Sequence, residues 1–387
     1  MEAIILAGGL GTRLRSAVSS LPKCLAPIGG QPFLYFLLED LARQGVTRVI
    51  LSVGYMREAV ISWVNSRQWP FAVEYAVEEK PLGTGGAVRL ALSLAREPRV
   101  LVLNGDTFFQ IPELSSLLSV NAPIALALKP MQDAGRYGSV VLSAEGGVTA
   151  FREKESAPGG RLISGGVYAV DRELFAGMEL PANFSFEKAV LEPLAGRALV
   201  KGLVSDGYFI DIGVPEDYAR AQVELPELQR VLTAYTAALA SEAETLFLDR
   251  DGVINRWLPG DYVKRWEEFV FLPGVLGMLA RCAGKFRRIV VVTNQRGVGR
   301  GRMRRETLDA IHQRMVREIA AAGGRIDGVY VSTAIADDDP SRKPNPGLFE
   351  AARRDYPDIS PARSLMLGDS DSDAAFAARC GMAFIPV

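Results

Sequence analysis

Cysteine and histidine are scarce in this sequence. Its 387 residues include three cysteines, at positions 24, 282 and 380, and a single histidine, His312. Three cysteines so far apart do not suggest the disulfide framework of a small secreted domain. A zinc site would need these few residues to converge, so we expect no zinc. Any catalytic metal should instead be held by carboxylates, which favours Mg²⁺.

Long apolar runs and an excess of one charge are also missing. No segment reaches the roughly 18 apolar residues of a membrane-spanning helix. The 44 Lys and Arg residues balance 45 Asp and Glu residues, which argues against nucleic acid or a membrane surface as a partner. An acid, Glu2, stands where a signal peptide would carry bases, so we expect a cytoplasmic protein. The composition leaves open whether the chain forms a homo-oligomer.

Short β-branched runs alternate with amphipathic helical stretches, a pattern typical of a parallel α/β sheet. A helical pattern starts at Pro215 or Glu216, is broken near Pro226 and runs to about Ala240, after which the α/β alternation begins again. We therefore predict one domain over residues 1–240, ending in this connecting helix, and another over residues 241–387. The predicted strands are residues 3–7, 48–53, 73–76, 100–103 and 124–128 in the first domain, and 246–249, 289–292, 329–332, 364–367 and 383–385 in the second.

A glycine-rich loop, LAGGLGTRL, follows the first predicted strand. Gly8, Gly9 and Gly11 let the backbone approach an anion closely, and ligands of open α/β sheets bind at the carboxyl ends of strands. The loop is not a Walker A motif, because no G-K-[S/T] follows. Nor is it G-x-G-x-x-G, because Leu14 stands at the last glycine position. Alone, it predicts either a tight βα turn or a phosphate-binding loop.

Charged residues near the other strand ends favour the phosphate-binding alternative. Arg13 and Lys23 place two cations close to the glycine loop in sequence. Asp106, in LNGDTFF, follows a buried strand, and Asp211, in FIDIGVPEDY, ends another, where acids are suited to hold Mg²⁺. A second glycine-rich turn, PLGTGGA at residues 81–87, opens a predicted helix.

Over residues 1–225 these motifs resemble the sugar-1-phosphate nucleotidyltransferase family, which implies a Rossmann-like α/β domain. The stretches LAGGLGTRL, LPKCLAP, PLGTGGA, LNGDTFF, SFEK and FIDIGVPEDY look most like its D-glycero-D-manno-heptose-1-phosphate guanylyltransferases. The resemblance implies that a sugar 1-phosphate attacks the α-phosphorus of GTP and that pyrophosphate leaves. This reaction needs no general base, because a phosphate monoester, with a second pKa of about 6, is largely a dianion at neutral pH.

The same resemblance implies roles for the matching residues. Arg13 and Lys23 would neutralise the leaving pyrophosphate, and Asp106 and Asp211 would hold Mg²⁺. Lys154 and Gly166 would contact the sugar phosphate. For Glu78, Glu79 and Glu187 a solvated surface charge is an equal alternative. The implied nucleotide-binding residues are Gly8, Gly9, Gly11, Thr12, Arg13, Lys23, Glu78 (or Glu79) and Gly83.

Four further motifs lie in the second half of the chain. FLDRDGVIN ends a predicted strand in Asp249 and Asp251, which point the same way in an extended chain. Two carboxylates so close need a cation or different roles. VVTNQRGVGRG ends a second strand in a hydroxyl and two amides, RKPNPG brings two cations, and GDSDSD places acids after a third strand.

As an ordered set over residues 244–387, these motifs resemble the haloacid dehalogenase-like phosphatases, which have a Rossmannoid fold. They look most like the heptose 1,7-bisphosphate phosphatases and nearly as much like the histidinol phosphatases. The resemblance implies that Asp249 attacks phosphorus and that Asp251 acts first as acid and then as base. Asp371 and Asp373 would either support the site or cap a helix. Phosphate would be bound by Thr293, Asn294, Arg342 and Lys343, and Mg²⁺ by Asp249, Asp369 and the backbone carbonyl of Asp251.

One segment departs from the phosphatase family, whose common form carries a zinc-binding Cys/His loop just before RKP. Residues 332–340 here read STAIADDDP, and the acidic run at 337–339 is expected to be a solvated turn. Because of this departure, the sequence defines the type of reaction better than it defines the sugar that leaves.

The two predicted activities fit consecutive steps, because a bisphosphate phosphatase makes the sugar 1-phosphate that the transferase uses. Mannose, glucose or amino-sugar phosphates, and other nucleoside triphosphates, remain alternatives. A regulatory protein with one inactive domain is the non-enzymatic alternative. The intact acids argue against it, namely Asp106, Asp211, Asp249, Asp251 and Asp369.

Overall fold

The computed structural model describes residues 1–9, 21–132, 137–152 and 161–387. The chain divides into two compact units, Met1–Leu225 and Pro226–Val387. The division falls inside helix α6 (Pro215–Ala240), whereas the sequence placed the boundary at the C-terminal end of this helix. The predicted break near Pro226 was wrong, because α6 continues through this residue. An interior proline removes one hydrogen bond and its ring crowds the carbonyl four residues earlier, yet α6 is not interrupted at this position.

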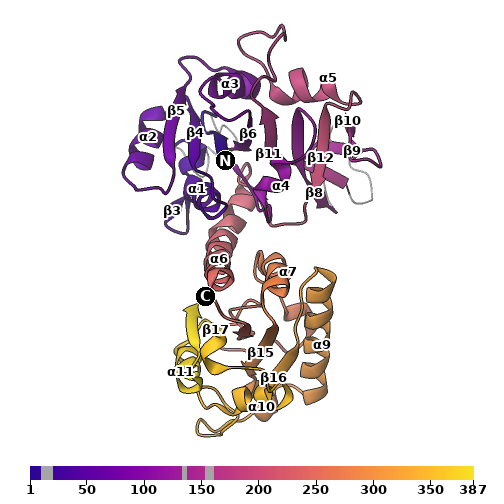
Figure 1. Ribbon diagram of the computed structural model, residues 1–387. Helices are drawn as coiled ribbons and strands as arrows, with labels where there is room; N and C mark the ends of the chain where they lie inside the picture. The colour runs from indigo at the N-terminus through magenta and orange to yellow at the C-terminus, as the bar shows by residue number, and fades with distance from the viewer. Residues whose placement is uncertain (10–20, 133–136, 153–160) are drawn as a thin grey trace. The chain divides into compact units, whose positions relative to one another are not determined.

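A mixed sheet forms the centre of the N-terminal unit (Figure 1). β1 (Glu2–Leu6) pairs in parallel with β4 (Arg48–Val53) and β6 (Arg99–Asn104), and β4 pairs in parallel with β5 (Ala72–Val77). β11 (Arg161–Asp171) pairs antiparallel with β6, with β8 (Ile124–Met131) and with β9 (Ser139–Leu142), and β9 pairs antiparallel with β10 (Val148–Arg152). Among the described residues, β12 (Val200–Val204) completes this sheet by pairing in parallel with β8.

The expectation of a wholly parallel sheet is therefore wrong for this unit. β9 and β10 form an antiparallel pair whose connecting turn includes Gly146, which has a positive φ of 79°. A short turn of this kind can join only antiparallel strands, since a parallel pair needs a long crossover. The sequence pattern predicted the main-sheet strands within residues 1–128 well, because helices separate them.

Two short strand pairs and several helices complete the N-terminal unit. β7 (Thr107–Phe109) pairs with β13 (Phe209–Asp211), and β2 (Pro27–Ile28) pairs with β3 (Gln31–Pro32). The pairing of β7 with β13 brings together two segments that lie far apart in the sequence. The helices are α1 (Phe33–Arg43), α2 (Arg57–Asn65), α3 (Gly83–Leu92), α4 (Leu114–Leu118) and α5 (Glu192–Leu194), with a 3-10 turn η2 (Lys23–Leu25) and a π-helical turn η3 (Glu187–Leu191).

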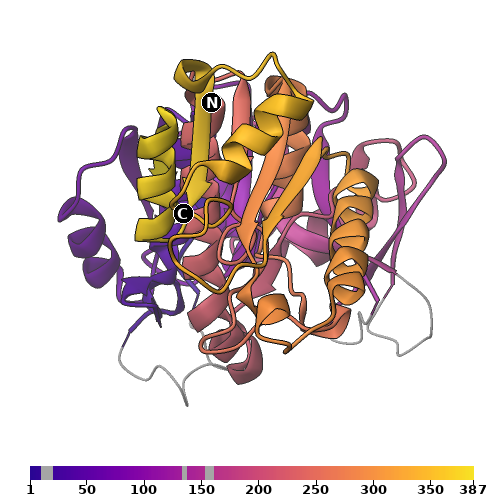
Figure 2. The same ribbon diagram turned by 90° about the horizontal axis from the view of Figure 1, so that it is seen from below.

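The C-terminal unit, every residue of which is described, has a parallel five-stranded sheet in the order β16-β15-β14-β17-β18. Figure 2 shows these strands side by side, with helices at both sides. The strands are β14 (Thr245–Leu248), β15 (Arg288–Asn294), β16 (Gly328–Ser332), β17 (Ser364–Gly368) and β18 (Ala383–Pro386). The helices are α7 (Val275–Lys285), α8 (Arg296–Gly299), α9 (Arg305–Ala321), α10 (Gly347–Asp355) and α11 (Asp371–Cys380), with 3-10 turns η4 (Trp266–Glu268) and η5 (Pro361–Arg363).

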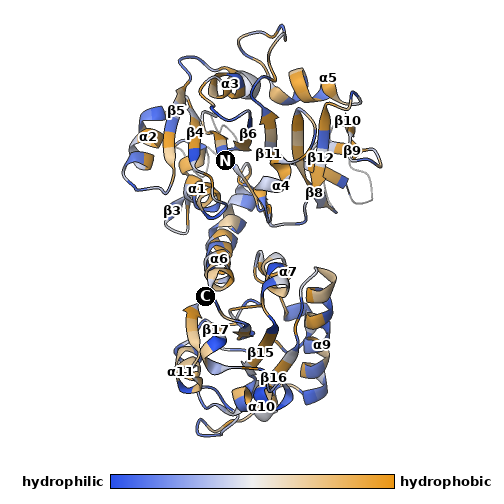
Figure 3. Ribbon diagram, viewed as in Figure 1, coloured by the Kyte–Doolittle hydropathy of each residue, from blue (hydrophilic) through white to orange (hydrophobic). Residues whose placement is uncertain are grey.

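Each unit has its own hydrophobic core, and the central strands are its most apolar parts (Figure 3). All six residues of β4 are buried, as expected for a parallel strand covered on both faces. In the C-terminal unit, Phe247, Val290 and Met366 pack with residues of α10 and α11 on one face of the sheet. Every strand that the sequence predicted is present. Among the described residues, no helix has both the length and the hydrophobicity of a membrane span.

Candidate active sites

The acidic centre of the N-terminal unit is built by the pairing of β7 with β13. Thr107 pairs with Asp211, and the Ile212 N–H donates to the Asp106 carbonyl over 3.1 Å. The two predicted metal ligands therefore lie close together. Lys23 lies beside both, with Nζ 2.6 Å from Asp106 Oδ2 and 3.7 Å from Asp211 Oδ1. Burial and the charge of Asp106 raise the pKa of Asp211, while Lys23 opposes this rise.

The predicted nucleotide loop begins next to Glu78. A Cβ added at Gly8 would lie 2.6 Å from Glu78 Oε1, so the backbone of Gly8 approaches this carboxylate closely. Glu78 also accepts hydrogen bonds from the Ser52 hydroxyl (3.1 Å) and the Leu82 N–H (3.1 Å). It therefore ties β4 and the turn before α3 together, which a solvated surface charge would not do. Glu79 instead pairs with Arg57 in an exposed position.

Gly83 and Gly166 occupy backbone positions that suit only glycine. Gly83 opens α3 with φ +67°, and Gly166 lies in an irregular part of β11 with φ +71°. A Cβ at Gly166 would lie 2.7 Å from Nδ2 of Asn104, two residues from Asp106. The structure thus places Gly166 beside Asn104, two residues before Asp106 in the sequence. Gly9 lies exposed in the same loop as Gly8. Four predicted site residues lie outside the described residues, namely Gly11, Thr12, Arg13 and Lys154.

A buried lysine lies at the centre of the C-terminal site. Lys343 Nζ is 2.9 Å from Asp249 Oδ1 and 2.6 Å from Asp373 Oδ1, and its side chain is 2% exposed. Burial raises the pKa of Asp249 to about 7, Lys343 opposes this rise, and the charge of Asp373 adds to it. The charges of Asp249 and Asp373 raise the pKa of Lys343 against the effect of burial. The lysine is therefore charged and held in place from two sides.

Asp373 is more central than the sequence indicated. It is fully buried, it contacts Lys343, and its Oδ2 accepts from the Ser370 hydroxyl over 2.6 Å. Ser370 in turn caps α11 by accepting from the Asp373 N–H. Asp371, by contrast, is exposed in the first turn of α11. Asp373 therefore supports the site and joins the helix cap at once, the two roles that the sequence offered as alternatives.

Three carboxylates of this site can hold a cation together. Asp249, Asp369 and Asp373 offer oxygen atoms that all lie within 4.8 Å of one another. An all-oxygen donor set of this kind fits Mg²⁺. Gly252 makes room for the Asp369 carboxylate: its φ is +83°, and an added Cβ would lie 1.8 Å from Asp369 Oδ2. Asp373 joins the two carboxylates that the sequence predicted, and the role of the Asp251 carbonyl stays a prediction.

Asp251 is held by four hydrogen bonds. The Arg250 Nη2 donates to both of its carboxylate oxygens over 2.8 Å, and the amides of Asn255 and Gln295 each donate over 2.8 Å. Burial alone would raise the pKa of Asp251, but the charge and hydrogen bonds of these neighbours hold it below its usual value. Asn255 and Gln295 were not among the predicted site residues, although both lie in the motifs that carried the resemblance.

The other predicted phosphate-binding residues differ in how they are placed relative to the buried lysine. Thr293, at the end of β15, is buried and accepts from Gln295 over 2.9 Å. The Asn294 amide makes two hydrogen bonds, both of 3.0 Å, with the backbone of Lys343 and so anchors the lysine. Arg342 points to Asp337, with Nε 3.2 Å from its carboxylate. Thr293, Asn294 and Lys343 therefore gather at one end of the sheet, whereas Arg342 is engaged in the next loop.

The acidic turn before RKP is organised by side-chain contacts. Asp337 pairs with both Arg296 and Arg342, and Asp339 accepts from the Ser341 hydroxyl over 2.6 Å. The Asn345 amide donates to the carbonyls of Asp337 and Asp339. Asp337 is exposed, as predicted for a solvated turn, but its two arginine partners connect this loop to α8 and to the lysine motif.

Comparisons with known proteins agree with this division of the chain. The family model described as nucleotidyl transferase matches residues 2–227, and a HAD-hydrolase-like model matches residues 340–387. The chain is 44% identical over 229 residues to a D-glycero-alpha-D-manno-heptose 1-phosphate guanylyltransferase of Aneurinibacillus thermoaerophilus, covering 58% of this chain and 98% of that protein. It is 43% identical over 218 residues to the protein of the same name from Campylobacter jejuni, covering 56% and 97%.

A solved structure shows the same fold in the N-terminal unit. The crystal structure of HddC from Yersinia pseudotuberculosis matches with a TM-score of 0.53 and 34% sequence identity, covering 57% of this chain and 97% of that one. The match at this coverage corresponds to one of the two units. The chain therefore belongs to the nucleotidyl transferase family, and its C-terminal residues 340–387 are similar to a HAD-hydrolase-like family.

Proposed function

We propose that this chain makes a GDP-linked heptose in two steps. The C-terminal unit removes the C7 phosphate of D-glycero-D-manno-heptose 1,7-bisphosphate, and the N-terminal unit transfers GMP from GTP to the resulting heptose 1-phosphate. The observation that carries the second step is the 43–44% identity to two heptose 1-phosphate guanylyltransferases over nearly their whole length. The cluster around Lys343 supports the first step.

In the transferase, the residues must align two polyanions rather than move protons. Lys23 would leave Asp106 and turn to the nucleotide phosphates, which it can do because its contacts lie in a partly exposed site. Its charge would then offset the charge that develops on the leaving pyrophosphate. Gly166 lets the Asn104 side chain pack against its backbone, two residues before Asp106, and we propose that this region contacts the sugar phosphate.

In the phosphatase, the chain's own residues supply nucleophile, acid and base. Asp249 attacks phosphorus and forms an aspartyl phosphate, while Lys343 offsets the negative charge that gathers there. Asp251 protonates the departing sugar oxygen and then takes a proton from the water that cleaves the aspartyl phosphate. Its low pKa in the free protein suits the base. To act as the acid in the first step, Asp251 needs a higher pKa, and the negative charge of the bound phosphate would raise it.

Both sites fit Mg²⁺, and we propose one or more ions for each unit. Asp106 and Asp211 would hold the ion of the transferase, and Asp249, Asp369 and Asp373 that of the phosphatase. Bound Mg²⁺ would neutralise phosphate charge and orient the reacting groups. We propose that zinc takes no part. Stoichiometric zinc in metal-purified protein, found by elemental analysis, would contradict this.

The phosphatase should act before the transferase. A transferase pocket shaped for a neutral C7 hydroxyl would leave a C7 phosphate unpaired and poorly solvated, which disfavours the bisphosphate. A time course by phosphorus NMR with heptose 1,7-bisphosphate and limiting GTP tests this order. We expect heptose 1-phosphate to accumulate before GDP-heptose. GDP-linked heptose 7-phosphate appearing first would reject the order.

The nucleotide and the sugar can be tested separately. Initial rates of pyrophosphate release with GTP, ATP, UTP, CTP and dTTP should show a clear preference for GTP. A panel of heptose, mannose, glucose and amino-sugar phosphates, with products identified by mass spectrometry, should favour heptose in both units. A preference for another sugar would keep the two reactions but replace the substrate.

A further inference from the structure

Arg250 is a cation in the interior of the C-terminal unit. Its side chain is fully buried, and burying a charge is costly unless it is paired. Nη2 contacts both oxygens of Asp251, Nη1 lies 3.0 Å from Nε2 of His312, and the guanidinium lies 6.0 Å from the ring centre of Phe269. The Arg250 guanidinium therefore contacts Asp251 through Nη2 and His312 through Nη1.

The chemistry of the two groups fixes the direction of the second contact. A guanidinium has only N–H donors and stays protonated in proteins. Nε2 of His312 must therefore carry a lone pair and accept, so the imidazole is neutral with its proton on Nδ1. Burial and the charge of Arg250 lower the pKa of His312 to about 3, which agrees with a neutral ring.

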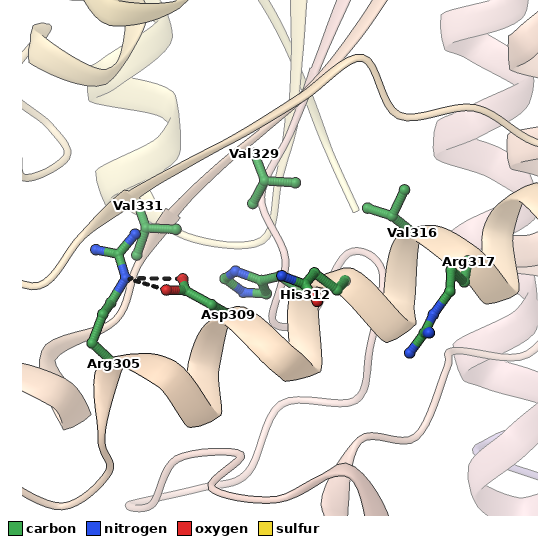
Figure 4. Close-up of a pocket in the computed structure, with 8 residues that line it drawn as sticks. Arg305, Asp309, His312, Val316, Arg317, Val329 and Val331 are labelled. Atoms are coloured by element: carbon green, nitrogen blue, oxygen red, sulfur yellow. Dashed lines mark hydrogen bonds and ion pairs between the residues drawn. The ribbon is translucent and has the colours of Figure 1, made fainter.

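His312 lies where α9 faces the edge strand β16. Together with Asp309 and Val316 of α9 and Val329 and Val331 of β16, it lines a groove of about 560 Å³ (Figure 4). The imidazole is only 5% exposed, and Arg250 is its one hydrogen-bond partner in the fully described C-terminal unit. The buried His312 side chain therefore contacts Arg250 in the interior of the unit.

We infer that His312 is a positioning residue for the phosphatase, because it fixes the guanidinium that orients the carboxylate of Asp251. This rests on the proposed function of the C-terminal unit. Without the acceptor, Nη1 would be a buried donor with no partner, and Arg250 would turn to find one. The carboxylate would then lose two of its four hydrogen bonds, and its oxygens would no longer be held in one orientation.

The two chemical steps depend on Asp251 differently. In the first, the bond from Asp249 to phosphorus forms, the bond from phosphorus to the leaving oxygen breaks, and the Asp251 proton goes to that oxygen. In the second, water attacks phosphorus, its proton goes to Asp251, and the Asp249–phosphorus bond breaks. A sugar alkoxide needs the proton to leave, whereas p-nitrophenolate does not. A misplaced Asp251 should therefore slow sugar esters in both steps but aryl esters only in the second.

The test compares His312→Leu, which removes the acceptor, with His312→Gln, which keeps an acceptor oxygen. Gln313→Leu is the matched control, because Gln313 lines the same groove without contacting Arg250. We expect His312→Leu to lower kcat on a sugar phosphate about 100-fold with a much smaller change in KM, as a 1 Å misplacement does. It should still release one rapid equivalent of p-nitrophenol from p-nitrophenyl phosphate. His312→Gln should recover most of kcat, and Gln313→Leu should match the wild type.

Equal loss of the burst and of sugar-phosphate turnover in His312→Leu would overturn the inference, as would full activity in this variant. If the wild type releases no phosphate from any ester, the proposed function fails and the inference falls with it. Should His312→Leu fail to fold, nitrogen NMR of the wild type still decides, since ¹⁵N-histidine labels a single ring. A neutral ring protonated on Nδ1 at pH 7 is expected. A protonated ring, or a proton on Nε2, would overturn the inference.

Discussion

The same arrangement, a lysine between two carboxylates, occurs in both units but in different surroundings. In the N-terminal unit the side chains of Lys23, Asp106 and Asp211 are 14%, 39% and 29% exposed. In the C-terminal unit those of Lys343 and Asp373 are 2% and 0% exposed. Hydrogen bonds between the Asn294 side chain and the Lys343 backbone further anchor this lysine, whereas Lys23 lies in a single 3-10 turn.

This difference matches what each proposed reaction asks of its lysine. A nucleotidyltransferase must admit a large triphosphate and then release pyrophosphate, so a cation that can exchange partners is useful. A phosphatase that forms a covalent intermediate needs its nucleophile held in one geometry, which a buried and doubly paired lysine provides. Burial, rather than the identity of the residues, distinguishes the two sites. Each of the following predictions tests that distinction, beginning with the largest effect.

Asp249→Asn should abolish phosphate release, by roughly 10⁴-fold or more, because it removes the nucleophile. Pyrophosphate formation from a sugar 1-phosphate should be unchanged, since the two acidic centres lie in separate compact units. Asp106→Asn should show the reverse pattern. Both activities are measured on the same preparation of each variant. Loss of both activities in a folded single variant would show that the sites are not independent.

Lys343→Met and Lys23→Met should separate the buried from the exposed arrangement by stability. Removing one partner of a buried ion pair costs about 3–5 kcal/mol, whereas a partly exposed pair is worth about 1 kcal/mol or less. Calorimetry should therefore show a large drop in the melting temperature of one transition for Lys343→Met and a small drop for Lys23→Met. Added GTP identifies the transferase transition, because a ligand stabilises only the unit that binds it. Equal losses would contradict the role given to burial.

The strand-end acids could be predicted because each follows a hydrophobic run, and parallel strands bring such ends to one edge. Asp249 and Asp369 follow neighbouring strands of one sheet in this way. The contact between Arg250 and His312 could not, because it joins residues 62 positions apart and depends on how α9 packs. Nor could the central place of Asp373, since Asp371 and Asp373 look alike until α11 turns one of them inward. The antiparallel strands β9 to β11 were missed because a helix-separated pattern dominates the rest of the chain.

The buried histidine should give the C-terminal unit a stability that depends on pH. His312 has a lowered pKa of about 3 when folded, against about 6.5 when unfolded, so the unfolded chain binds more protons between these values. Its contribution is complete above pH 6.5 and is lost as the pH falls toward 3, by about 1.4 kcal/mol per unit at most. His312→Gln should lack this part of the slope. Urea unfolding at several pH values compares the two proteins, which share every other titrating group; parallel curves would contradict the prediction.

The smallest effect should come from Asp371→Asn, and it sharpens the contrast with Asp373. Both residues lie in the first turn of α11, where a negative charge is favourable by about 0.3–1 kcal/mol. Asp371 is exposed, so its substitution should cost no more than this and leave phosphate release within about twofold. Asp373→Asn has the same change of charge and size, yet it removes a buried partner of Lys343 and a possible ligand oxygen. Only this variant should lower both stability and phosphate release strongly. If the two variants behaved alike, position in the helix rather than contact with the lysine would account for Asp373.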